Sequence, residues 1–256
     1  MDGTTLIVRE LGDGIWVFNE GNDGREYVDA YLITGKERAL VVDSLMNDTT
    51  FYEKARQITN LPIDVVVTHG HPDHAGLALK AFYDSRCDIY MREMDLPMLK
   101  KGVEAAWFKP LPPDKVFDLG GRKLEVIPLP GHTSGSVVLF DRAAQILYTG
   151  DAIGAGVFWM QIPNALPLNE FMKNLESLRK DMEDYSDLKI HPGHRHQAPV
   201  QLTREFMDDT LLMTRKIVSG EWVGEDSEMT MGGQSIKFKK LAYKLMTDYC
   251  YNPENL

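Results

Sequence analysis

The stretch that decides the fold reads Thr68-His69-Gly70-His71-Pro72-Asp73-His74, and four of its side chains are of types that bind metal ions. It directly follows the apolar segment 63–67, which is typical of a buried strand. His69 and His71 are two residues apart, so in extended backbone their side chains point to the same side. The end of this strand therefore presents two imidazoles to one point.

The second half of this stretch turns away from the strand. Pro72 cannot continue the strand pairing and begins a turn. Asp73 and His74 follow where residues 75–82 can form a helix, with Asp73 near the helix N-terminus. A strand end, a turn and a helix start can aim two pairs of ligands at two adjacent points, which suits two metal ions better than one.

The other histidines follow the same pattern. The chain has seven histidines, and all lie in three short segments that each follow a predicted strand: His69, His71, His74, His132, His191, His194 and His196. A lone buried histidine is usually a hydrogen-bonded core residue, but histidines scattered by chance would not gather at strand ends. The pattern therefore predicts a metal site.

Three more motifs accompany these histidines: Pro130-Gly131-His132-Thr133, Thr149-Gly150-Asp151 and Pro192-Gly193-His194. Together with residues 69–74, and in this order, they resemble the motifs of the metallo-β-lactamase superfamily over roughly residues 5–198. The alternation of strands and helices by itself predicts a layered α/β domain with helices covering packed sheets. The resemblance implies a four-layer αββα sandwich with the metals at one edge between the sheets.

The resemblance also implies a set of ligands. The first ion is held by His69, His71 and His132, the second by Asp73, His74 and His194, and Asp151 bridges the two. Imidazole nitrogen and carboxylate oxygen are ligands that zinc prefers, so we expect two divalent metal ions, most often zinc. Iron and manganese stay open because the same donors serve them.

Two such ions lower the pKa of a shared water to about 7 and so supply a bridging hydroxide at neutral pH. Asp73 is the expected catalytic residue, because it can orient that water or carry its proton. Asp151 is typical of the thioesterase-like, lactonase-like and phosphodiesterase-like branches of the superfamily, and His71 argues against the flavodiiron branch, which has glutamate there. We expect a metal-dependent hydrolase of a small carboxylic ester, thioester or lactone. The alternatives are a phosphoric-ester hydrolase and a non-catalytic metal-binding or redox protein.

Length and composition set the domain organisation. The chain has 256 residues, a hydrophobic content of 43% and a formal net charge of −10. We expect one αββα domain over residues 1–198 and a short C-terminal helical extension over residues 199–256 that packs on it, with helices beginning at Thr203 and covering 238–249. No strong basic block occurs, so we expect no nucleic-acid partner, and the substrate is a small molecule.

The expected compartment is the cytoplasm. The first residues lack a charged segment followed by an apolar stretch, and no run is long enough to cross a bilayer, so we expect no signal peptide and no membrane partner. Cys87 and Cys250 are far apart and match no metal-site spacing, which favours reduced thiols. A homo-oligomer stays open.

Two assignments have alternatives. Asp43 ends a predicted strand close to the histidine motif, where it is either a hydrogen-bond partner of a ligand histidine or a simple turn residue. His191, His194 and His196 compete for the last ligand position. The Pro-Gly-His match favours His194, which leaves His191 and His196 as neighbours of the site or of the substrate.

Candidate substrate contacts lie in two loops. Phe158, Trp159 and Met160 follow Asp151 after two glycines, in a stretch with neither strand alternation nor a helical stripe. They form either an apolar pocket wall or a plug in the core beneath the loop. Trp107, in a proline-containing loop, and His196 are further candidates. An apolar wall would favour an acyl chain over a highly charged group.

Overall fold

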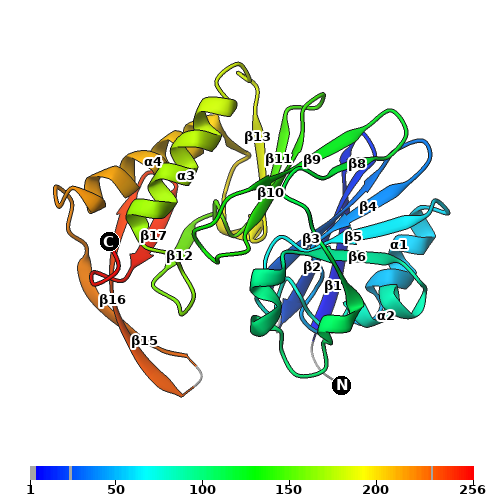
Figure 1. The fold of residues 1–256 in the computed structure, drawn as a ribbon, viewed down its shortest axis with the longest axis horizontal. Helices are drawn as coiled ribbons and strands as arrows, with labels where there is room; N and C mark the ends of the chain where they lie inside the picture. Colours follow the sequence, from blue (N-terminus) through cyan, green and yellow to red (C-terminus); the bar gives the residue numbers. More distant parts are fainter. Residues whose placement is uncertain (1–3, 23–24, 232) are drawn as a thin grey trace.

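Two β-sheets face each other at the centre of the protein, and the computed structural model describes residues 4–22, 25–231 and 233–256 of it (Figure 1). The first sheet has the strand order β1-β2-β3-β4-β5-β6-β7. Its strands are β1 (Thr4–Gly12), β2 (Ile15–Asn22), β3 (Arg25–Thr34), β4 (Ala39–Val42), β5 (Ile63–Val66), β6 (Asp88–Met91) and β7 (Phe108–Pro110). The strands from β1 to β4 pair antiparallel, and those from β4 to β7 pair parallel.

The second sheet has the strand order β14-β13-β11-β10-β9-β8. Its strands are β8 (Val116–Asp118), β9 (Lys123–Pro128), β10 (Val137–Asp141), β11 (Ile146–Gly150), β13 (Lys189–Pro192) and β14 (Leu202–Thr203). β10 and β11 form an antiparallel hairpin, and β11 pairs parallel with β13.

The strands are apolar on both faces because both faces are covered. In β3, Ala30 and Leu32 face the helices beside the first sheet, whereas Tyr31 and Ile33 face the second sheet. This alternation follows from the period of two residues along a strand. A strand buried on both sides appears in the sequence as a continuous apolar run, as β4 does.

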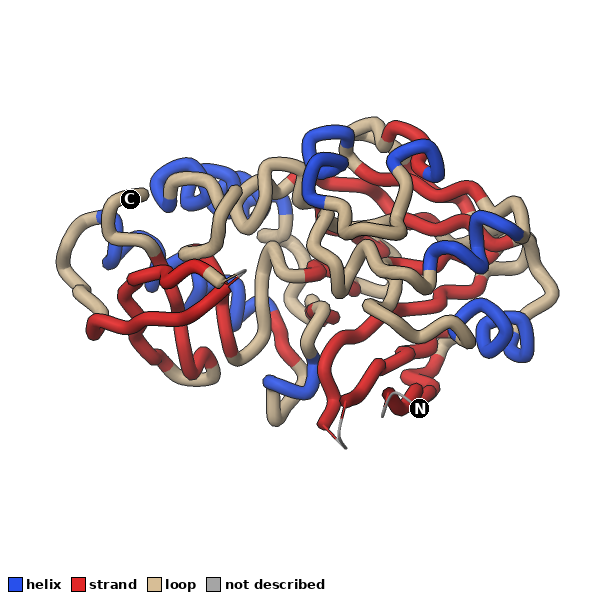
Figure 2. Tube along the Cα trace, turned by 90° about the horizontal axis from the view of Figure 1, so that it is seen from below, coloured by secondary structure: helices blue, strands red, loops and turns tan. Residues whose placement is uncertain are grey.

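Helices complete the four layers. α1 (Phe51–Ile58) and α2 (Leu79–Asp84) cover the first sheet, and α3 (Leu168–Asp181) and α4 (Arg204–Val218) cover the second. From right to left in Figure 1 the layers are α1 and α2, the first sheet, the second sheet, and α3 and α4. In Figure 2 most helices lie outside the strands. The expected αββα sandwich is confirmed.

The expectation of a purely helical C-terminal extension is wrong. The predicted helix over 238–249 is instead part of β16 (Gln234–Tyr243) and β17 (Met246–Tyr251), which join β15 (Glu225–Met231) and β12 (Val157–Met160) in a third sheet of order β12-β17-β16-β15. β17 pairs parallel with β12, so a partner distant in sequence decides the conformation of this segment. The extension therefore contains one helix, α4, and a β-meander.

One predicted helix differs in detail. The helix expected over 75–82 begins later, as α2. Gly76, which precedes α2, packs so closely that a Cβ there would lie 2.0 Å from the Leu45 carbonyl oxygen. After β6 the chain forms the short 3₁₀ helix η1 (Glu93–Met98), which has Pro97 inside it. Two further 3₁₀ turns are η2 (Ala105–Trp107) and η3 (Arg195–Gln197).

In the part of the chain that the structure describes, no helix is both long and apolar enough to cross a membrane. Residues 1–3, on which the expectation of no signal peptide rested, lie outside the described residues.

Candidate metal centre

The histidine and aspartate side chains predicted as ligands meet at one edge of the sandwich. His69, His71, Asp73 and His74 follow β5, His132 follows β9, Asp151 follows β11 and His194 follows β13. Three groups of their donor atoms each lie within 4.8 Å of one another: His69 with His71 and His132, His69 with His74 and Asp151, and Asp73 with His74 and His194. The first and third groups match the two sets that the sequence resemblance implied.

The first group consists of three neutral imidazoles. The His132 Nε2 and His71 Nδ1 atoms are 2.9 Å apart, and the rings of His69 and His71 have centroids 4.8 Å apart. Burial lowers the pKa of His71 to about 3 and that of His69 well below its usual range, and the pKa of His132 is lowered by burial as well. Their lone pairs are therefore free to bind a cation at neutral pH.

The second group is acidic as well as basic. The His194 Nε2 atom lies 3.6 Å from Asp73 Oδ2, and His74 Nε2 lies 3.9 Å from the same oxygen. Burial opposes the charged form of both histidines, but the Asp151 and Asp73 carboxylates outweigh it. They raise the pKa of His194 to about 9 and that of His74 well above its usual range. A cation bound here would take the place of those protons.

Asp151 lies between the two groups. One of its oxygens is 3.3 Å from His74 Nε2, and the other is 3.3 Å from His194 Nε2 and 3.7 Å from His132 Nε2. Burial alone would raise its pKa, but His194 and His74 hold that pKa well below its usual range. Oδ2 therefore faces a donor of each group, and Oδ1 faces His74 of the second group. An ionised carboxylate placed between two groups of donors in this way can bridge two cations.

The donor atoms fit metal ions. His69 Nε2, His74 Nε2 and Asp151 Oδ1 are buried and have no hydrogen-bond partner within the described ranges 4–22, 25–231 and 233–256. Buried polar atoms without a partner are rare in folded proteins and call for an explanation such as an ion. Imidazole and carboxylate donors are those that divalent transition metals prefer.

Four of the histidines are oriented through their other ring nitrogen. His69 Nδ1 contacts Thr68 Oγ1 at 3.1 Å, His74 Nδ1 contacts Asp43 Oδ2 at 2.9 Å, and His132 Nδ1 contacts the Trp159 carbonyl oxygen at 2.9 Å. His194 Nδ1 contacts the Tyr27 carbonyl oxygen at 2.5 Å. Such contacts fix the tautomer and the ring orientation of metal-binding histidines, and they occur at nearly all of them.

Asp43 contacts His74, as the first of the two alternatives considered from the sequence expects. Besides contacting His74, its carboxylate accepts hydrogen bonds from the Thr68 backbone N–H at 2.7 Å and the Thr68 hydroxyl at 2.9 Å. Its φ of 63° lies in the left-handed region, which aspartate tolerates better than most residues. Asp43 thus ties the end of β4 to both His74 and the start of the histidine motif.

The three histidines near β13, His191, His194 and His196, occupy different places in the structure. His194 joins Asp73 and His74, whereas His191 is buried against Tyr31 and Tyr148, in the interior between the sheets. His196 is exposed, with its ring centroid 5.9 Å from that of His194. A Cβ on Gly193 would lie 2.3 Å from His74 Cε1, so only glycine lets the backbone pass this close to the cluster.

A pocket of about 380 Å³ opens over the cluster. Its lining includes the metal-binding candidates His71, Asp73, His132, Asp151 and His194. The rest of the lining is mostly apolar or aromatic: Tyr27, Met46, Pro72, Trp159, Ile162, Gln197 and Met231. Size and composition are those of a small-molecule site.

Of the predicted substrate contacts, the structure brings only Trp159 into this lining. Phe158 and Met160 are buried in the core between the second sheet, the third sheet and the helices, because β12 is a strand with alternating burial. Trp107 is buried against the first sheet, and His196 does not line the pocket. The alternation in β12 is hidden in the sequence because all four of its residues are apolar.

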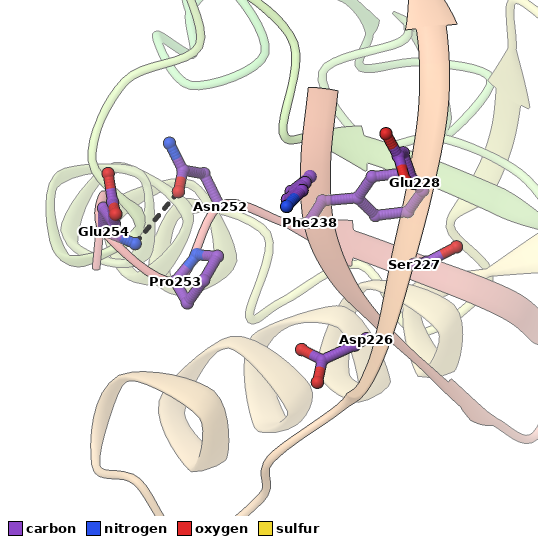
Figure 3. A pocket seen from close by; sticks show the side chains of 8 residues that line it. Asp226, Ser227, Glu228, Phe238, Asn252, Pro253 and Glu254 are labelled. Carbon is purple, nitrogen blue, oxygen red and sulfur yellow. Dashed lines mark hydrogen bonds between the residues drawn. The ribbon is translucent and has the colours of Figure 1, made fainter. Parts of the chain in front are cut away.

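Sequence reasoning missed the pocket residues Tyr27, Met46, Ile162 and Met231. They come from separate elements and have no spacing in common, so no signal in the sequence could have grouped them. A larger hollow of about 670 Å³ lies between β15, β16 and the C-terminal residues 252–254 (Figure 3). None of the ligand candidates lines it.

Comparison with known proteins agrees with this geometry. The family model of the metallo-beta-lactamase superfamily matches residues 23–194, and the chain belongs to that superfamily. Its members generally bind divalent metal ions, often zinc. A relative in Gallus gallus, named acyl-coenzyme A thioesterase MBLAC2, is 26% identical over 224 residues, which cover 73% of this chain and 79% of the relative.

A hydroxyacylglutathione hydrolase of Anaeromyxobacter dehalogenans is 28% identical over 187 residues, which cover 72% of this chain and 67% of the relative. Among solved structures, a metallo-beta-lactamase from Pontibacter korlensis superposes with a TM-score of 0.64 at 20% identity. The superposition covers 82% of this chain and 99% of that protein. The structural likeness supports the fold.

Proposed function

We propose that this protein is a dinuclear metal-dependent hydrolase of a small carboxylic ester, thioester or lactone with an apolar acyl part. The observation that carries the proposal is the position of Asp151 in the pocket lining, where its Oδ2 atom lies 3.3 Å from His194 Nε2 of the second group and 3.7 Å from His132 Nε2 of the first group. His69, His71 and His132 would hold one ion, Asp73, His74 and His194 the other, and Asp151 both.

When bound, the two ions would lower the pKa of water, so that hydroxide is available at neutral pH, and would stabilise negative charge on the substrate. Side chains of the protein would orient the water and accept its proton. Asp73 lines the pocket and lies within 3.9 Å of both His74 and His194, where its carboxylate can accept the proton of a nucleophilic water.

Tyr27 is a second polar group at this pocket. Burial and the nearby Asp73 and Asp151 carboxylates raise the pKa of its phenol to about 12. The hydroxyl therefore keeps its proton at neutral pH and acts as a hydrogen-bond donor toward Asp73 or a substrate oxygen.

The pocket lining supports the substrate class. Trp159, Ile162, Met46 and Met231 form apolar walls, and among the residues that the structure describes neither lysine nor arginine lines the pocket. A phosphoric ester would bring negative charge that only the ions could balance, whereas an acyl chain matches these walls. The hydrolase names of the two relatives point the same way. The complete donor set favours an enzyme over a non-catalytic metal-binding or redox protein.

The test is metal analysis combined with a substrate screen. Purified protein should carry close to two ions per chain and should hydrolyse chromogenic esters, thioesters or lactones faster than bis(4-nitrophenyl) phosphate. Asp151→Ala should lose at least one ion and nearly all activity. Full activity with a single ion at saturating zinc would rule out the dinuclear mechanism, and preferred hydrolysis of the phosphodiester would replace the substrate class.

A further inference from the structure

Asp95 is a fully buried carboxylate that belongs to none of the donor groups described above. It lies in η1, after β6, and has no solvent exposure. No lysine, arginine or histidine of the described ranges 4–22, 25–231 and 233–256 forms an ion pair with it. A buried charge without a counter-ion is costly unless hydrogen bonds satisfy it, so its partners define its role.

Three donors satisfy this carboxylate. Asp95 Oδ2 accepts hydrogen bonds from the Gly70 backbone N–H at 2.9 Å and the Thr133 hydroxyl at 2.6 Å, and Oδ1 accepts one from the Gly135 backbone N–H at 2.8 Å. Gly70 lies between His69 and His71 in the sequence. Thr133 directly follows His132. One side chain thus joins the two loops that carry the three histidines of the first group.

The packing around Asp95 shows that this contact is close. A Cβ on Gly70 would lie 2.6 Å from the Asp95 carbonyl oxygen, and a Cβ on Gly135 would lie 2.5 Å from the Asp95 carboxylate. Both loops approach Asp95 through glycine, where any other residue would force them apart.

Asp43 and Asp95 contact different parts of the donor cluster. Asp43 contacts His74, in the second group, and reaches the first group only through Thr68. Asp95 contacts no ligand ring and acts only on the backbone and hydroxyl groups beside His69, His71 and His132. The His71 and His132 nitrogens, 2.9 Å apart, come from the two loops that Asp95 joins.

We propose that Asp95 is a positioning residue that holds the His69–His71 loop and the His132 loop at the separation the first metal ion requires. The inference rests on the proposed function in that the first group binds a metal ion. Outer partners of metal ligands typically contribute 10- to 100-fold in affinity.

Asp95→Asn is the decisive variant because it keeps the shape of the side chain. An amide has one acceptor oxygen, so its NH₂ group must face at least one of the three donors. We expect the zinc affinity of the first site, measured by chelator competition on the full chain, to fall about 10- to 100-fold. Absorption spectra of the cobalt-substituted protein report on each site separately, because His132→Ala removes the bands of the first site and His194→Ala those of the second. In Asp95→Asn the bands of the first site should shift, and the bands of the second site should stay unchanged.

Two further variants keep the test sharp. Thr133→Val removes one of the three hydrogen bonds and should lower the zinc affinity of the first site by a smaller factor than Asp95→Asn does. Thr133→Ser keeps the hydroxyl and should keep the wild-type affinity. Asp141→Asn is the matched control, because Asp141 is equally buried but is hydrogen-bonded to Arg122 and Ala144. It should lower the melting temperature without changing zinc affinity.

The outcomes separate the two proposals. If the wild-type protein binds two zinc ions and Asp95→Asn binds both with unchanged affinity, Asp95 is only a structural residue and this inference is wrong. Equal loss of both sites would also contradict it. A wild-type protein that binds no zinc would instead contradict the proposed function.

Discussion

At the scale of single residues, His191 links burial to the response of the protein to acid. Its ring is stacked with the Tyr148 ring at a centroid distance of 5.5 Å, and its Nδ1 atom has no hydrogen-bond partner in the described part of the chain. Burial, together with Arg195, Lys189 and Arg122, lowers its pKa to about 3. In the unfolded chain a histidine titrates near 6.5.

This shift fixes the sign of a pH effect. Between about pH 6.5 and pH 3 the unfolded state binds a proton at His191 and the folded state does not. The free energy of unfolding therefore falls as the pH falls. His191→Phe keeps a ring beside Tyr148 but cannot titrate. Urea unfolding of metal-free protein at pH 7.0 and 5.5 should show a loss of stability that is smaller in the variant by about 1 kcal/mol. An identical pH dependence in both proteins would show that His191 takes up its proton in the folded state.

Some residues of the candidate site could be predicted from the sequence, and others could not. The donors from His69 to His194 lie in short motifs at strand ends, so local spacing was enough to group them, and the structure brings them together. Asp43 was recognised as a candidate because it is also at a strand end. Asp95 was not, because its three hydrogen bonds join loops that are distant in the sequence.

At the scale of elements, β12 determines which apolar side chains reach the pocket. Trp159 faces the pocket, and the Trp159 carbonyl oxygen orients His132. Its neighbours Phe158 and Met160 point into the core, where Phe158 packs against Phe171 and Tyr249. Adjacent residues of one strand therefore have different functions.

Two substitutions in this strand should have opposite signatures. Trp159→Ala leaves the carbonyl oxygen in place, so metal content should not change, while KM for apolar esters should rise several-fold. Phe158→Ala should lower the free energy of unfolding by about 3–5 kcal/mol with little effect on KM in the folded fraction. Steady-state kinetics, zinc content and urea unfolding of both variants provide the comparison. A large loss of stability with unchanged KM in Trp159→Ala would place that side chain in the core.

The element predictions succeeded where pattern and burial agree. The strand predicted over the apolar segment 63–67 is β5, and the strand predicted to end at Asp43 is β4. The prediction of a helix over 238–249 is wrong because the mixture of lysine and apolar residues in this segment suits a helix or a strand. Pairing of β17 with β12 and β16 decided in favour of strands.

At the scale of the whole molecule, the pocket is shared between the sandwich and the C-terminal extension. The metal-binding candidates come from the two central sheets, whereas Met231 comes from β15, at the end of the β15–β16 hairpin. The figures show this hairpin as the outer part of the third sheet (Figures 1 and 2). The sequence motifs end near His194, so the superfamily resemblance alone could not include this wall.

Met231 should therefore affect long acyl groups more than short ones. Its side chain is 38% exposed in the pocket, and an acyl chain that covers it would remove apolar surface from water. A short acyl group stays near Asp73 and Asp151 and would not reach the hairpin.

The test is an acyl-length series with Met231→Ser. We expect KM for a 4-nitrophenyl octanoate ester to rise about three- to tenfold, which corresponds to about 0.7–1.4 kcal/mol, while 4-nitrophenyl acetate is hydrolysed as by the wild type. Thr230→Ala, next to it and outside the pocket lining, should change neither. An equal rise for both esters would show that the substitution disturbs the metal cluster. An unchanged KM for the octanoate would show that the acyl chain lies against Trp159 and Ile162 and that the extension has no part in substrate selection.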